Sequence, residues 1–413
     1  MGSKAWLVFV AVAGLAWGTY VPLIAYGGSE LGGPQLGISP RLLAILCVGV
    51  AYFLIGVLFP AFYLMRTPKA AQPEWTVTGL TFSGLAGAAG ALGAICVIFA
   101  TSASFAAAAK HHLANKGAYK LYIAPLIFGL APIINTLVSM VWHPKKGKPF
   151  HFGFTMPHPV LWLGIFSVAA GAFLVLFAKD LSESTGNFNV GDVFSGLGET
   201  WFLYVLLAGL SWGTYVPLIF YGGSELGGKP ASRLLAILCV GVAYFLIGVL
   251  LPVVLLLQTP ADKQPVMNPI GLTFAGLAGA AGAIGAIGVI FATKSAVEAA
   301  RQSNMPPATY KLYIAPLIFG LAPVINTLVS MVWEPKGDAW STFGFHPPHW
   351  ILWVGIVAVG LGAALVLLAK ELGESGAPKA APAPAAVPGL AAANGGTLVG
   401  EPGASATGGA SGR

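Results

Sequence analysis

Long stretches of the first half of this chain return almost unchanged in the second half. Residues 14–33 recur at 209–228 with 18 of 20 positions identical, and residues 41–60 recur at 233–252 with one change. Residues 119–142 recur at 310–333, again with one change. Recurrence at this level indicates an internal duplication, so the chain consists of two related units.

Each unit holds five apolar segments of about 20 residues, the length that a helix needs to cross a bilayer. Only 8% of the residues are charged, against ~25% in a typical soluble domain. This composition excludes an ordinary cytosolic enzyme and a disordered chain. The sequence therefore predicts an all-α integral membrane protein with ten transmembrane helices. The expected spans are 5–26, 42–65, 77–101, 119–142, 160–178, 202–221, 234–257, 269–293, 310–333 and 350–369.

The domain prediction follows from the duplication. We expect a first five-helix repeat over 1–185, a linker over 186–200, a second repeat over 201–375 and a disordered Ala/Pro/Gly-rich tail over 376–413. The first apolar segment recurs inside the chain, where no signal peptidase would remove it. It is therefore interpreted as a retained span rather than a signal peptide.

An odd number of spans per repeat places the two repeats upside down relative to each other. With the N-terminus in the cytoplasm, 14 Lys and Arg residues fall inside and 7 outside, although Lys110, Lys116 and Lys120 lie on the outer side. Loop 143–154 has three lysines where the equivalent loop 334–345 has one lysine and two acids. We therefore predict inverted repeats in the plasma membrane, the inner membrane of a bacterium, with both termini cytoplasmic.

The polar residues inside the spans are uncharged, and most occur twice. The motif WGTYVP lies at 17–22 and 212–217. Its proline, Pro22 or Pro217, removes a backbone donor and frees a carbonyl group, and is a candidate gating residue. Its aromatic rings suit the faces of a sugar or an aromatic solute. The alternative is a kinked span packed by aromatic side chains.

A second duplicated motif ends in Ile-Asn-Thr, at 134–136 and 325–327. An amide in hydrocarbon must find a partner. That partner is either a neighbouring helix, which would make the asparagine structural, or a solute in a central cavity. The small-residue segments 83–94 and 275–286 predict close helix packing.

A third motif, GGSELGG, brings Glu30 and Glu225 close to the WGTYVP helices. They are either solvated carboxylates in a glycine-rich turn or gating and proton-coupling residues. Proton-coupled transport and facilitated diffusion both stay open.

Other functional classes find no support in the sequence. The three cysteines, Cys47, Cys96 and Cys239, lie in apolar segments and have no metal-ligand spacing. No nucleotide-binding loop or Ser/His/Asp set occurs, and the basic residues are scattered through loops. We predict no enzyme activity, no cofactor, no metal and no nucleic-acid partner.

The tryptophan–glycine–proline pattern of the first span resembles the opening helix of the drug/metabolite transporter superfamily (EamA-like proteins). The proline-centred fourth span and the final segments 163–179 and 353–370 resemble the end of that family's repeat. Its sugar-porter branch is the nearest. The near-identity of the two halves departs from most single-chain members.

The resemblance implies a transporter that works by alternating access around a central cavity lined by the first four helices of each half. Its cargo would be a small polar neutral solute, a sugar or related metabolite. A multidrug or amino-acid exporter and a non-transporting membrane scaffold are the alternatives. The candidate solute-binding residues are Trp17, Tyr20, Asn135, Thr136, Trp212, Tyr215, Asn326 and Thr327.

Overall fold

The computed structural model describes residues 5–110, 120–154, 158–183, 199–227, 229–302, 307–335, 337, 339–345 and 347–375. The chain divides into two units, Met1–Glu374 and Ser375–Arg413. The tail predicted at 376–413 lies outside the described residues. So does the linker predicted at 186–200, apart from its last two residues.

The two halves of the first unit contain the same succession of helices. The first half contains α1 (Ala5–Glu30), α2 (Ser39–Phe53), α3 (Phe59–Arg66), α4 (Val77–Lys110), α5 (Lys120–Val141) and α6 (Val160–Glu183). The second half contains α8 (Thr200–Glu225), α9 (Pro230–Phe245), α10 (Leu251–Leu257), α11 (Pro269–Gln302), α12 (Pro307–Val332) and α13 (Trp350–Ser375).

Within the described ranges, eight helical segments are long and apolar enough to cross a membrane. They correspond to the first eight of the ten predicted spans. At the positions of the last two, the described residues include the shorter apolar helices Leu317–Val332 and Trp350–Val366. The chain is therefore an all-helical protein with the helices of a multi-pass membrane protein.

The second span of each half contains a π-helical segment. Leu54–Leu58 joins α2 to α3, and Leu246–Leu250 joins α9 to α10. Pro60 and Pro252 follow these segments directly, in the first turn of the next helix. Proline offers no N–H to the carbonyl four residues earlier, so a wider turn accommodates it without ending the helix.

The two halves interlock through their first helices. Helix α1 packs against α11 and α12 of the other half, and α8 packs against α4 and α5. Gly18 makes room on α1 for Ile325, and the equivalent Gly213 makes room on α8 for Ile134. Because each half supplies the neighbours of the other half's first helix, neither half builds its core alone.

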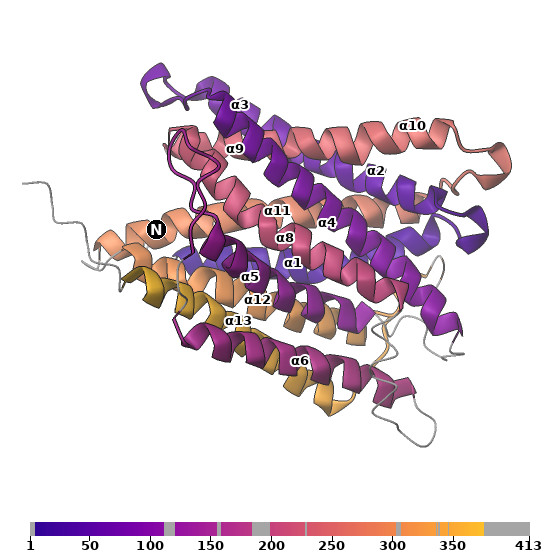
Figure 1. Ribbon diagram of the computed structural model, residues 1–413. Coiled ribbons are helices and arrows are strands. Elements are labelled where there is room, and N and C mark those ends of the chain that lie inside the picture. Colours follow the sequence, from indigo (N-terminus) through magenta and orange to yellow (C-terminus); the bar gives the residue numbers. More distant parts are fainter. Residues whose placement is uncertain are drawn as a thin grey trace, which may run out of the picture. The chain divides into compact units, whose positions relative to one another are not determined.

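Equivalent helices that meet run in opposite directions. The backbone at Gly49 approaches Gly248, whereas Gly56 approaches Gly241. Residue numbers therefore rise along one helix while they fall along the other. Helices α6 and α13 also contact each other in an antiparallel arrangement, through their glycines. In Figure 1 this pair lies on the side of the bundle away from α2, α3, α9 and α10.

Candidate functional site

The two tryptophans of the WGTYVP motifs lie in equivalent places, each inserted against the other half. The Trp17 indole N–H donates to the carbonyl of Gly282 on α11 at 3.2 Å. The Trp212 indole N–H donates to the carbonyl of Gly90 on α4, also at 3.2 Å. Both indole N–H groups are therefore already hydrogen-bonded to backbone carbonyls. Each ring could contact a solute only through its face and its C–H edge.

Aromatic side chains from both halves join these tryptophans into one central cluster. The ring of Phe128 lies 6.4 Å from that of Trp17 and 5.9 Å from that of Trp212. Its equivalent, Phe319, lies 6.1 Å from Phe128 and 6.4 Å from Trp17. The predicted residue Tyr20 packs edge-on against Trp212 at 6.3 Å. The structure thus brings predicted residues of the two halves together.

A pair of tyrosines that the sequence analysis did not select lies beside this cluster. Tyr52 and Tyr244 stack with ring centroids 3.7 Å apart, and their hydroxyl groups interact. Tyr20 and Tyr215 lie close to this pair. The Tyr20 hydroxyl is buried and has no hydrogen-bond partner among the described residues. A tyrosine repeated within an otherwise apolar span was the signal that could have identified the pair.

The Ile-Asn-Thr motifs are buried on α5 and α12. Asn135 is 8% exposed and Asn326 is fully buried. The hydroxyl of Thr136 donates to the carbonyl of Pro132 within the helix at 2.9 Å. The amide oxygen of Asn135 and the hydroxyl of Thr327 have no hydrogen-bond partner among the described residues. These two buried atoms retain hydrogen-bonding capacity that the described part of the protein does not use.

One cavity lies at the end of α1 that carries Glu30. It measures about 140 Å³, and its wall includes Ser29, Arg41 and Thr101 from α1, α2 and α4. A second cavity of about 10 Å³, close to the size of one water, lies further along α2 and α4 and reaches Tyr244. Ile98 belongs to both walls. None of the twelve predicted binding and gating residues lines either cavity.

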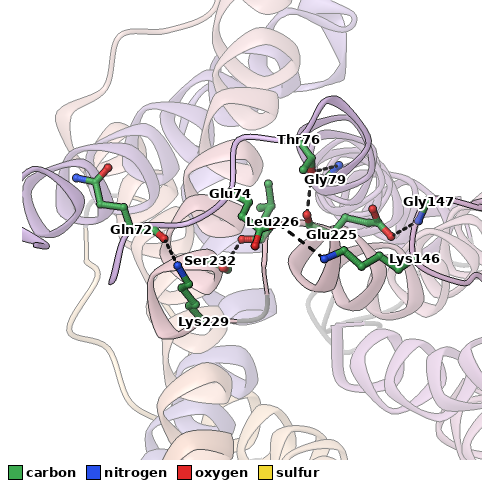
Figure 2. A network of polar contacts seen from close by, with 10 residues as sticks. All are labelled: Gln72, Glu74, Thr76, Gly79, Lys146, Gly147, Glu225, Leu226, Lys229 and Ser232. Atoms are coloured by element: carbon green, nitrogen blue, oxygen red, sulfur yellow. Dashed lines mark hydrogen bonds and ion pairs between the residues drawn. The ribbon is translucent and has the colours of Figure 1, made fainter. Parts of the chain in front are cut away.

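The end of α8 that carries Glu225 is tied to the first half by a polar network (Figure 2). The Glu225 carboxylate accepts the backbone N–H of Gly147 at 2.9 Å, and its own carbonyl accepts the Thr76 hydroxyl at 2.9 Å. The N–H of Glu74 donates to the carbonyl of Leu226 at 2.9 Å. Glu225 is only 4% exposed. We call these five residues the Glu225 network.

Charged side chains surround this network. Lys146 pairs with Glu74 at 3.8 Å, but both side chains are largely exposed, so the pair contributes little. The ammonium group of Lys229 donates to the carbonyls of Ala70 and Gln72 at 3.3 and 3.2 Å. Together these contacts bind the segment before α4 and the loop after α5 to the end of α8.

A matching network of hydrogen bonds attaches the end of α1 to the second half. The N–H of Val266 donates to the carbonyl of Leu31 at 2.9 Å, the counterpart of the bond between Glu74 and Leu226. The carboxylate of Glu30 accepts the Asn268 side-chain amide at 3.2 Å, and Tyr26 donates to the carbonyl of Gly337 at 2.7 Å. Unlike Glu225, Glu30 is only partly buried.

The prolines and cysteines complete the predicted set. Pro22 and Pro217 lie inside α1 and α8, and both helices continue through them. All three cysteines are free thiols. Across the described ranges, no group of three or more His, Cys, Asp or Glu residues is arranged to hold a metal ion.

Comparison with known proteins finds a distant structural likeness for the chain. No protein-family model matches it, and no curated protein matches it. One similar solved structure, described as "Crystal structure of protein", shares 16% sequence identity and covers 89% of this chain and 99% of its own, with a TM-score of 0.43. A likeness this distant assigns neither a fold nor a function.

Proposed function

We propose that the protein is a secondary transporter that moves a small polar neutral solute by alternating access between two inverted five-helix repeats. The observation that carries the proposal is the relation between the two ends of the bundle. A cavity lies at the Glu30 end between α1, α2 and α4, and a separate, much smaller one lies further along α2 and α4 at Tyr244. The Glu225 end is held by a dense polar network. The Glu225 network and its counterpart at Glu30 hold the two ends of the bundle. A carrier that rocks between two conformations would break one of these networks each time it opens that end.

The length of α4 supports the inverted arrangement. Near its start, Gly79 packs against Leu226, and near its end Thr101 lines the cavity beside α1. The 22 residues between them span about 33 Å, close to the thickness of a bilayer's hydrocarbon core. The ends of α1 and α8 would then face opposite sides of the membrane, as ten spans in inverted repeats require.

The same geometry separates two equivalent loops. Gly147 of loop 143–154 contacts Glu225, whereas Gly337 of loop 334–345 contacts Tyr26 at the other end. The lysine-rich loop would face the cytoplasm of a bacterial cell, together with both termini. This arrangement agrees with the resemblance to the drug/metabolite transporter superfamily.

The chemistry of the central cluster favours a neutral polar solute, a sugar or a related metabolite. Buried polar atoms without a hydrogen-bond partner among the described residues include the Tyr20 hydroxyl in this cluster, and the Asn135 amide oxygen and the Thr327 hydroxyl on α5 and α12. Aromatic faces beside such groups suit a ring that carries both C–H and hydroxyl groups. Export of drugs or amino acids would use the same mechanism with a different cargo.

A non-transporting membrane scaffold is the second candidate, and one observation favours it. The indole groups of Trp17 and Trp212 are bound to backbone, and the Ile-Asn-Thr side chains are buried. In a scaffold these contacts would be permanent. In a carrier they would belong to one conformation.

Two measurements separate these candidates. The full chain in proteoliposomes should exchange labelled sugar for internal unlabelled sugar, tested with glucose, ribose and rhamnose. In a cysteine-free background, Thr101→Cys and Thr136→Cys should both react with a water-soluble thiol reagent in the carrier. Absence of exchange for every sugar, together with an unreactive cysteine at 136, would support the scaffold.

A further inference from the structure

Loop 143–154, which joins α5 to α6, folds as a small ordered hairpin. Two isolated antiparallel β-bridges form here, one between Trp142 and Phe152 and one between Lys145 and Lys148. The N–H of His143 donates to the carbonyl of His151 at 3.0 Å, and the Trp142 indole donates to the carbonyl of Pro149 at 2.7 Å. The hairpin therefore begins where the apolar helix α5 ends and holds a fixed shape.

Two kinds of side chain project from this hairpin. Three phenylalanines are strongly exposed, Phe150 at 80%, Phe152 at 61% and Phe154 at 70%. Three lysines, at 145, 146 and 148, are also exposed. Exposed aromatic rings are costly in water but stable at the level of lipid headgroups, where their apolar faces leave water. Lysines beside them would meet the lipid phosphates.

The duplication supplies a matched comparison. The equivalent loop also pairs its strands, at Trp333 with Phe343, and also exposes its aromatic side chains, Trp340 at 53%, Phe343 at 68% and Phe345 at 69%. Its sequence carries one lysine and two acids instead of three lysines. The bridge at the base and the aromatic exposure are therefore common to both loops, and a net positive charge is particular to one.

We propose that hairpin 143–154 is a binding surface for anionic lipid headgroups, and that loop 334–345 has no such preference. Three lysines are fewer than the four to eight of a typical polybasic segment. The exposed rings would add apolar contacts with the upper acyl chains. A soluble anion or a nucleic acid would leave these rings in water, so a lipid surface fits both features of the hairpin.

The hairpin is also bonded to the Glu225 network. Gly147 donates its N–H to Glu225, and the carbonyl of Lys145 lies 3.4 Å from the Tyr221 hydroxyl. Anionic lipid on the hairpin therefore contacts the same loop that holds α8. The proposal needs only a membrane-embedded protein and does not depend on transport.

The test uses the purified full chain in neutral detergent, titrated with short-chain phosphatidylglycerol or phosphatidylcholine and followed by native mass spectrometry of lipid adducts. We expect phosphatidylglycerol to bind at least about tenfold more tightly, and raising the concentration of the volatile salt ammonium acetate from about 0.05 to about 0.5 M to reduce that preference. The variant Lys145→Gln/Lys146→Gln/Lys148→Gln should lose it. The control Lys69→Gln/Lys263→Gln, which removes exposed lysines elsewhere, should keep it.

Several results would overturn the proposal. They are equal binding of the two lipids, binding insensitive to salt, or an unchanged preference in the triple variant. Equal loss in the control would assign the effect to net charge alone. Soluble glycerol phosphate should not compete, and full competition would assign the hairpin to a soluble anion. The salt titration uses the unmodified chain, so a preference that is insensitive to salt overturns the proposal even if the triple variant fails to fold.

Discussion

The rings of Tyr52 and Tyr244 stack 3.7 Å apart with their planes within 5°, and the two residues hold the same position in the two copies. The proposed inverted repeats would place a pseudo-two-fold axis between them. The two tryptophan–carbonyl bonds, each 3.2 Å, would be related by this axis. Because contacts recur in pairs, equivalent substitutions in the two halves can serve as replicates of one experiment.

Gly93→Ala and Gly285→Ala should both destabilise the protein. A methyl group at Gly285 would overlap the indole of Trp17, and one at Gly93 would overlap that of Trp212. Neither indole can retreat without losing its hydrogen bond to the other half. Overpacking of this kind costs about 1–3 kcal/mol. Thermal unfolding in detergent should show a lower melting temperature for each variant.

Gly84→Ala and Gly276→Ala are the matched controls on the same two helices. A methyl group at either position would meet nothing within 4 Å. These variants should melt at the wild-type temperature or above it, because alanine favours a helix over glycine. Equal destabilisation by all four substitutions would contradict the packing described around the tryptophans.

The topology can be tested at two equivalent loop positions. Lys148→Cys and Ala339→Cys, each in a background lacking Cys47, Cys96 and Cys239, place one exposed thiol on each loop. An impermeant maleimide added to intact cells should label position 339 and not position 148. Permeabilisation should expose both. Labelling of both thiols from the same side would end the inverted-repeat proposal.

Much of this architecture could be predicted from the sequence because the bilayer imposes a simple rule. Apolar length alone located eight helices that the structure contains. Whether they invert in a membrane stays a prediction. The π segments at Leu54 and Leu246 were not foreseen, since their cause is a local response to Pro60 and Pro252.

The candidate site was less predictable. Sequence reasoning selected Trp17 and Trp212 for their rings, but it could not know that their indole donors reach Gly282 and Gly90 in the other half. It also did not select Tyr52, because its partner Tyr244 lies in the other half of the chain and is not a neighbour in sequence. The cavity at Arg41 is formed by residues of α1, α2 and α4 together. A local sequence pattern does not show how these three helices are placed relative to one another.

Asn135→Leu tests the role of the buried amides. The amide oxygen of Asn135 has no hydrogen-bond partner among the described residues, so its removal should not lower the melting temperature. If a solute binds there, sugar exchange should fall about ten- to a hundredfold, which corresponds to ~1–3 kcal/mol of lost hydrogen bonding. Asn326→Leu changes the equivalent residue in the second half, which does have an interaction partner, so the expectation for the melting temperature applies to Asn135→Leu alone. Loss of folded protein in step with loss of exchange would instead make the amides structural.

The two glutamates should differ in their effect on coupling. Glu225 is 4% exposed and accepts a backbone N–H from Gly147. A glutamine at 225 would still offer an oxygen to that N–H, so Glu225→Gln should change transport little. Glu30 is partly exposed and close to the cavity, on the proposed outer side, where protons would enter a carrier driven by a proton gradient.

We therefore expect Glu30→Gln to change the pH dependence of transport more than Glu225→Gln does. Protonation of Glu30 removes the charge that faces Asn268, and so favours a different conformation of that end. Initial uptake rates in proteoliposomes, measured from about pH 5 to about pH 8 with and without a protonophore, would reveal the difference. If the double glutamine variant keeps full activity and a protonophore leaves solute accumulation unchanged, neither glutamate couples transport to protons. Facilitated diffusion, or coupling to another ion, would then be the mechanism that fits this pair of networks.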